Sequence, residues 1–137
     1  MKTNIFDLNL VRRDTFIAKL ASLYSQVSVE KGDFLNITLG SHEVSIAVSE
    51  KYRDLVSELA EGEEVLNQMD DLVALSLVFT GEFLQTPGVV CEAVRRLAWE
   101  QINVIEIVST MNELTFVIKR EDSMRAFDVL QGLFNGT

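Results

Sequence analysis

Residues 73–79 read VALSLVF, residues 102–109 read INVIEIVS and residues 113–119 read ELTFVIK. These segments alternate apolar with small or polar residues or are rich in β-branched residues, which is typical of β-strands. Residues 86–98, TPGVVCEAVRRLA, separate the first of them from the second and repeat apolar residues at helical spacing. A second amphipathic pattern, opened by Asp122, holds Met124, Phe127, Leu130, Leu133 and Phe134. The stretch therefore predicts the order β-α-β-β-α.

The start of the first predicted helix is well marked. Thr86 is an expected N-cap, and Pro87 suits the first helical position because its missing N–H has no intrahelical partner there. Trp99, near the end of this helix, is expected to pack or to anchor an interface. Cys91 is expected to lie near the apolar face as a small apolar residue.

The first half of the chain repeats much of this order of predicted helices and strands. Residues 16–24 form a helical stripe for which Asp14 is the expected cap, residues 35–39 and 44–48 alternate as two strands, and residues 52–59 form a second helical stripe. The segment 43–46 matches 113–116 at an offset of 70 residues. Whether residues 4–10 supply a first strand stays open at this point.

This order predicts an α+β protein. We expect ferredoxin-like βαββα units in tandem, a divergent one over residues 1–65 and a second over residues 66–137. Each such unit leaves a sheet edge uncovered, so two copies can pair into an extended antiparallel sheet of eight strands with the helices on one face.

Composition excludes several classes of protein. The chain has 12 Lys and Arg against 21 Asp and Glu, a net charge of −9, which opposes nucleic-acid binding. Residues 58–71 hold six acidic side chains and no basic one, and we expect them to form a solvated linker. No apolar run reaches the roughly 18–20 residues needed to cross a membrane, and no leader pattern opens the chain. A soluble cytoplasmic protein is expected.

Few residues suit catalysis or metal binding. Cys91 and His42 are each the only residue of their type, so neither a thiolate zinc cluster nor a two-histidine site can form within one chain. Residues 80–88 contain no Arg, Lys or His to hold a phosphoryl group, which disfavours an acylphosphatase-like enzyme. We expect no catalytic residue, no metal and no cofactor.

The ordered series Thr86-Pro87-Gly88-Val89, Ile102-Asn103-Val104, Ser109-Thr110 and residues 113–118 resembles the ACT domains at the C-terminal end of aspartokinases. The resemblance covers residues 72–134, and residues 12–60 look like a second, more divergent ACT unit. An aspartokinase would carry a catalytic domain ahead of this region, for which the chain has no room, and no Gly-rich phosphate loop is present. The resemblance therefore implies a free-standing regulatory module and not an enzyme.

In this family the loop before the first helix and the start of the next strand form an effector site across an ACT–ACT interface. Unpaired N–H groups at a helix start suit a carboxylate, and a carboxamide oxygen suits an ammonium group. By this analogy the expected ligand-binding residues are Glu82, Gln85, Thr86, Gly88, Val89, Asn103, Val104, Ile105 and Ser109.

The implied ligand is a free amino acid, with lysine or threonine as candidates. The implied assembly is a homodimer or higher homo-oligomer, with an amino-acid biosynthetic enzyme as a further partner. The alternative is a purely structural oligomerisation module with no retained ligand site, because Thr86 and Pro87 are explained equally well by helix-start chemistry and Asn103 by satisfying strand-end backbone groups.

Overall fold

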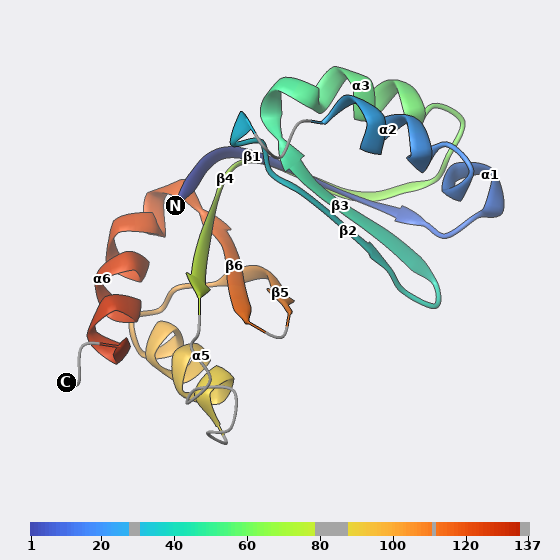
Figure 1. Cartoon of the computed structure of the whole chain (residues 1–137). Coiled ribbons are helices and arrows are strands. Elements are labelled where there is room, and N and C mark those ends of the chain that lie inside the picture. Colours follow the sequence, from blue (N-terminus) through green and yellow to red (C-terminus); the bar gives the residue numbers. More distant parts are fainter. Residues whose placement is uncertain (28–30, 79–87, 111, 135–137) are drawn as a thin grey trace. The chain divides into compact units, whose positions relative to one another are not determined.

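The computed structural model describes residues 1–27, 31–78, 88–110 and 112–134 (Figure 1). It divides into two compact units, one of Thr3–Leu72 and one of Met1–Lys2 together with Val73–Thr137. Each unit has a separate cluster of buried apolar side chains. None of the helices in the described part of the chain is long and apolar enough to cross a membrane.

The Thr3–Leu72 unit follows the order β-α-β-β-α-β. Strand β1 (Lys2–Val11) leads into the short helices α1 (Asp14–Ile17) and α2 (Leu20–Gln26). Then come β2 (Leu35–Leu39), β3 (Glu43–Ser49), the 3-10 turn η2 (Glu50–Tyr52), α3 (Arg53–Leu59) and the first half of β4 (Val65–Val78). The strand order β2-β3-β1-β4 is ferredoxin-like, and α2 and α3 lie on one face of the strands (Figure 1). Residues 4–10, left open by the sequence, lie within β1.

The second unit has the predicted β-α-β-β-α order. The second half of β4 is followed by α5 (Val89–Trp99), β5 (Val104–Ser109), β6 (Glu113–Lys119), the 3-10 turn η3 (Arg120–Asp122) and α6 (Ser123–Phe134). The strand order is β4-β6-β5, so β5 is an edge strand, and α5 packs beside α6 (Figure 1).

Strand β4 serves both units. The described strands are hydrogen-bonded in the order β2-β3-β1-β4-β6-β5, which confirms the predicted α+β class with tandem ferredoxin-like units in an antiparallel sheet. The order holds six strands instead of eight for two reasons. One continuous strand ends the first unit and begins the second, and no strand follows α6 within the described residues.

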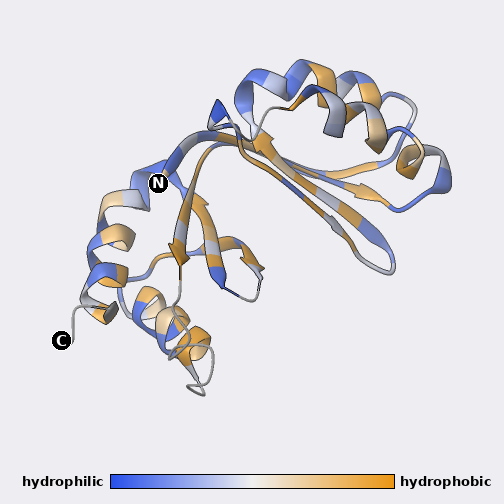
Figure 2. Ribbon diagram, in the orientation of Figure 1, coloured by the Kyte–Doolittle hydropathy of each residue, from blue (hydrophilic) through white to orange (hydrophobic). Residues whose placement is uncertain are grey.

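The alternating patterns seen in the sequence place apolar side chains under the helices. In β3, Val44, Ile46 and Val48 are fully buried, and the register with β1 sets Leu8 opposite Ile46 and Leu10 opposite Val44. Figure 2 shows this apolar character along the strands of both units. The second core is built in the same way from residues of β4, β6 and the two helices, chiefly Val73, Leu97, Leu114, Phe116, Ile118 and Leu130.

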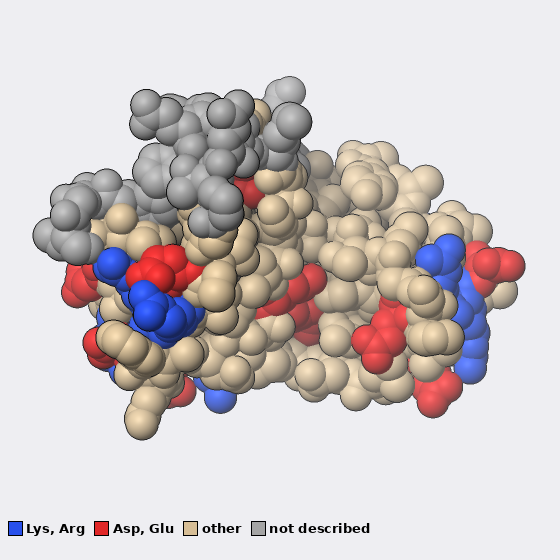
Figure 3. Space-filling model, turned by 90° about the horizontal axis from the view of Figure 1, so that it is seen from below, with Lys and Arg blue, Asp and Glu red and all other residues tan. Residues whose placement is uncertain are grey.

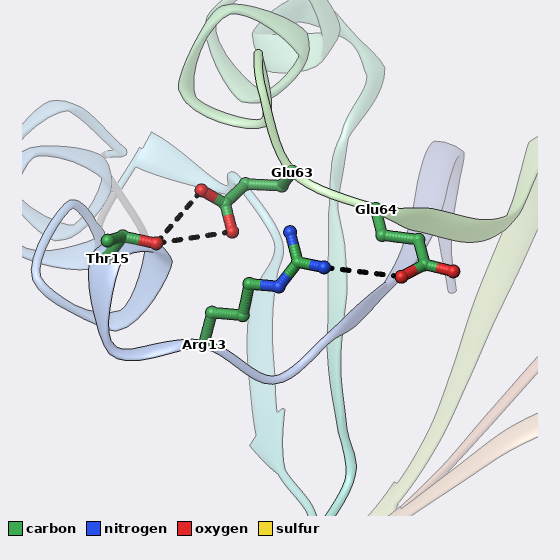
Figure 4. A network of polar contacts seen from close by, with 4 residues as sticks. All are labelled: Arg13, Thr15, Glu63 and Glu64. Carbon is green, nitrogen blue, oxygen red and sulfur yellow. Dashed lines mark hydrogen bonds and ion pairs between the residues drawn. The ribbon is translucent and has the colours of Figure 1, made fainter.

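The acidic segment 58–71 is largely exposed, as predicted, but it is not a linker, because it contains the end of α3 and the first half of β4. Residues 65–71 belong to β4, and the side chains of Glu63 and Glu64 bind Thr15 and Arg13 (Figure 4). Composition alone is misleading here because the partners of these carboxylates lie about fifty residues earlier in the chain.

The first helical stripe also differs from its prediction. Arg13, in extended conformation, holds the N-cap position, so Asp14 lies in the first turn, where its carboxylate faces the positive end of the helix dipole. The stripe is divided into α1 and α2 at Ala18 and Lys19, yet Phe16, Leu20 and Leu23 are still buried together.

Two residues expected near apolar faces are exposed. Helix α5 buries Ala93 and Leu97, which are one turn apart, and Cys91 lies on another side of the helix. Met124 is 64% exposed because it lies only one residue into α6, before the turns that cover the sheet. His42 lies in the turn between β2 and β3 and is exposed.

Candidate functional site

Helix α5 begins at Val89, two residues later than Pro87. Gly88 holds the N-cap position with φ of 82°, a left-handed conformation that glycine adopts without steric cost. Among the described residues no side chain caps this end of the helix, and the Gly88 carbonyl accepts the first helical hydrogen bond from the Glu92 N–H at 2.9 Å. The prediction that Thr86 caps the helix is therefore wrong. Thr86 and Pro87 themselves lie outside the described residues, as do Glu82 and Gln85.

The described atoms leave the start of α5 uncovered. Gly88 is exposed, and a Cβ atom added there would meet no described atom within 4 Å. The N–H groups of the first helical turn have no intrahelical acceptors, and the helix dipole makes this end positive. Together with half-buried Val89, Gly88 can thus present backbone donors to an anionic group.

Asn103 lies at the opposite end of the same helix. The Gln101 N–H donates to the Ala98 carbonyl, and the Ile102 N–H donates to the Leu97 carbonyl, both at 3.0 Å. These bonds, with Gln101 in the left-handed region at φ of 58°, form a Schellman motif that ends α5. Exposed Asn103 follows directly. Since α5 spans 11 residues, roughly 16 Å at 1.5 Å per residue separates Gly88 from Asn103.

The remaining predicted residues lie along β5. Val104 pairs with Ile118 and Glu106 with Val117, so Ile105 is the extra residue of a bulge. Ser109 ends the strand. Strand β5 runs parallel to β4. The last residue of β5 therefore lies at the same end of the strands as the last residue of β4, from which the chain continues toward α5. Ser109 thus lies at the end of the strands where α5 begins. Asn103, Val104 and Ile105 lie at the opposite end of the strands, where α5 ends.

A surface pocket between α5 and α6 was not predicted. It has a volume of about 370 Å³ and is lined by Glu92, Arg95, Arg96, Trp99, Glu100, Asp128, Val129 and Gly132. The Trp99 side chain is 76% exposed, and the Arg95 guanidinium lies 5.4 Å from the centre of its ring. The sequence feature that could have indicated this pocket is the mixture of acidic and basic residues over 92–100, next to Trp99. Figure 3 shows acidic and basic side chains close to one another on the face that it draws.

Glu92 binds both arginines that line this pocket. Its carboxylate accepts hydrogen bonds from Arg96 Nε at 3.0 Å and from Arg95 Nη2 at 2.6 Å. These two bonds, that of Arg96 first, hold the pKa of Glu92 below its ordinary value of 4.5.

A lowered pKa means that Glu92 stabilises the fold in its charged form, and that this contribution is lost as the pH falls through the lowered value. We expect Tm to fall more between about pH 5 and about pH 3 in the wild type than in Glu92→Gln, which has no charge to lose. Thermal unfolding of both proteins at several pH values measures this difference. Glu100→Gln, at an exposed position of the same pocket, is the control and is expected to behave as the wild type. Parallel pH profiles of the wild type and Glu92→Gln would contradict the assignment.

The Thr3–Leu72 unit has a polar pocket of its own, with a volume of about 500 Å³. The buried Asp33 carboxylate accepts a hydrogen bond from the Tyr52 hydroxyl and pairs with Lys51 Nζ at 2.7 Å. The bond to Asp33 raises the pKa of Lys51 above 10.5. The remaining lining residues are Thr3, Asn4, Ser49 and Glu50. Nothing in the described part of the chain groups three or more His, Cys, Asp or Glu side chains in a way that could hold a metal ion.

The sequence matches no protein-family model and no curated protein. Solved structures do match. The aspartate kinase of Clostridium acetobutylicum aligns with 99% of this chain at a TM-score of 0.80 and 16% identity, and this chain covers 34% of that protein. The ligand-free regulatory subunit of aspartate kinase from Thermus thermophilus aligns with 96% of this chain at a TM-score of 0.72 and 17% identity, and 92% of that subunit is covered.

A third match is the T-state structure of Escherichia coli aspartokinase III in complex with lysine and aspartate. It aligns with 97% of this chain at a TM-score of 0.64 and 16% identity, and 32% of that protein is covered. All three alignments extend over nearly the whole of this chain, through both units and the shared strand β4. The chain therefore has the tandem ACT-like fold of the regulatory domains of aspartate kinase.

Proposed function

We propose that this chain is a free-standing regulatory module that binds a free amino acid at an interface between ACT-like units and modulates an enzyme of amino-acid metabolism. The observation that carries the proposal is the alignment of 96% of the chain with 92% of a protein described as a regulatory subunit of aspartate kinase. The aspartokinase III structure with lysine and aspartate supports an amino acid as the ligand, and lysine and threonine are the first candidates.

The geometry favours a site shared between two units. A free amino acid carries its carboxylate and ammonium groups only a few ångströms apart, whereas Gly88 and Asn103 of one unit lie roughly 16 Å apart along α5. No single amino acid can bridge that distance. The two groups must therefore come from different units if both contact one ligand.

Edge strand β5 offers a way to bring them together. It has six residues and so is roughly 20 Å long, a length comparable with the roughly 16 Å of α5. Antiparallel pairing of β5 with its copy in a second chain would bring Asn103 of one chain to the end of the strand where Ser109 and the start of α5 lie in the other. Such a twofold arrangement creates two equivalent sites per dimer.

Each group then has a defined role. The N–H groups beyond Gly88 receive the ligand carboxylate, and the Asn103 carboxamide oxygen accepts a hydrogen bond from the ammonium group. The loop residues Glu82, Gln85 and Thr86 are proposed to contact the rest of the ligand, with Val89, Val104, Ile105 and Ser109 forming the walls. Regulation requires only that the ligand bind one arrangement of the units more tightly than another.

Calorimetric titration with lysine, threonine, aspartate, methionine and the branched-chain amino acids tests the proposal. We expect saturable binding of at least one of them, with sedimentation showing a dimer or higher oligomer. Folded protein that binds none of them at millimolar concentration would reject the proposal.

A second candidate is a purely structural oligomerisation module without a ligand. The exposed Trp99 beside the α5/α6 pocket favours it, because large exposed aromatic side chains are common at protein interfaces. This candidate predicts that Trp99→Ala disrupts the oligomer and that no amino acid changes Tm.

A further inference from the structure

In the Thr3–Leu72 unit, the chain's own carboxylates lie against the connection from the first strand to the first helix (Figure 4). The Thr15 hydroxyl donates to the Glu63 carboxylate, 3.2 Å from Oε2 and 3.5 Å from Oε1. Lys19 Nζ lies 3.7 Å from Oε2 of the same group. The Glu63 side chain is only 6% exposed, so it is held within the unit and is not a surface charge.

The backbone holds Glu63 in this position. Gly62, with φ of 82°, turns the chain at the end of α3, and the Glu63 N–H donates to the Ala60 carbonyl at 3.0 Å. Two contacts hold the next residue, Glu64. The Glu64 carbonyl accepts the Val11 N–H at 2.9 Å, and the Glu64 carboxylate pairs with Arg13 at 3.3 Å. Backbone hydrogen bonds on both sides of Glu63 thus fix the turn that places its side chain.

The corresponding connection of the other unit lies mostly outside the described residues. It leads from β4 to α5 and contains the loop residues of the proposed ligand site. At its described end, Gly88 is exposed and has no described atom within 4 Å of its Cβ position. The carboxylate in the first unit comes from the segment between α3 and β4.

We propose that Thr15 and Lys19 form a carboxylate-binding site whose occupant is Glu63 of the same chain. Resting on the proposed function, this assignment implies that the first strand-to-helix connection is already occupied, so that a free amino acid binds only at the site proposed at the start of α5. Each chain then binds one ligand molecule and not two. A side chain that mimics the ligand carboxylate stabilises the first unit permanently.

The Glu63→Ala variant tests the assignment, because it removes a –CH2–COO⁻ group that acetate can replace. We expect Glu63→Ala to lower Tm by about 4–8 °C, the shift typical when a domain of this size loses one buried interaction. Sodium acetate should recover at least half of that loss, whereas sodium chloride of equal ionic strength should not. Acetate is expected to leave the wild type and the control Glu61→Ala unchanged, since Glu61 is exposed on the same turn.

An equal response of Glu63→Ala and wild type to acetate would overturn the assignment. If Glu63→Ala does not fold in chloride, the readout becomes recovery of the helical circular dichroism signal on adding acetate, and absence of recovery has the same meaning. Because acetate is the probe, this result is independent of whether the wild type binds an amino acid. A calorimetric stoichiometry of two amino acids per wild-type chain would also overturn the assignment.

Discussion

Replacing Asn103 by alanine is expected to weaken amino-acid binding by roughly 10- to 150-fold. In the proposed site the Asn103 carboxamide oxygen accepts a hydrogen bond from the ligand's ammonium group, and a hydrogen bond to a charged group contributes about 1.5–3 kcal/mol. Stability should change little, because Asn103 is exposed and follows the Schellman motif without belonging to it. Calorimetric titration of wild type and variant with the amino acid that the wild type binds gives the two Kd values.

The control for this variant is Asn67→Ala. Asn67 is also an exposed asparagine, but it lies in the first half of β4 and outside the proposed site. Its loss should leave the Kd unchanged. If both variants bind the ligand as the wild type does, Asn103 is not a ligand residue, and the shared site would lose its only proposed ammonium acceptor.

Replacing Phe116 by alanine is expected to lower the free energy of unfolding by about 3–5 kcal/mol. Phe116 is fully buried in β6, the central strand of β4-β6-β5, and belongs to the same cluster as Leu97 and Leu130 of the two helices. Removing the ring leaves a cavity where sheet and helices meet, and the loss is a large part of the about 5–15 kcal/mol typical of a folded domain. Urea unfolding followed by circular dichroism measures it.

Met124→Ala provides the matched comparison on the same unit. The sequence placed Met124 in the apolar stripe of the last helix, whereas the structure leaves it 64% exposed. The expected change is within about 0.5 kcal/mol. A loss at Met124 comparable to that at Phe116 would show that the face of α6 has been assigned wrongly.

Much of the fold could be predicted because it depends on local periodicity. The alternation at 113–119 and the helical spacing at 90–97 each require a single buried face, and β6 and α5 form there. The start of α5 was predicted two residues early, since Thr86 and Pro87 are favourable helix-start residues wherever they occur, whereas the backbone conformation of Gly88 sets the observed start.

The candidate site was predicted less completely. Gly88 and Asn103 have suitable chemistry and lie at opposite ends of α5, as the helix predicted between them implies, but the sequence carries no information on how two units would bring them together. The α5/α6 pocket and the binding of Glu63 by Thr15 and Lys19 could not be predicted, because each depends on residues that are distant in the chain.

By itself, the sequence determined the fold class, the tandem repeat and the identity of most buried residues, because apolar periods of two and 3.6 residues leave few alternatives for which face is buried. Only the tertiary structure decided that one strand, β4, serves both units, and that residues 65–71 of the acidic segment are part of the sheet. Only the tertiary structure also showed that Glu63 lies against the first strand-to-helix connection. The physical reason is the same in each case. Strand sharing and carboxylate binding are pairings between distant segments, and their energies depend on hydrogen-bond and ion-pair distances that exist only in the folded chain.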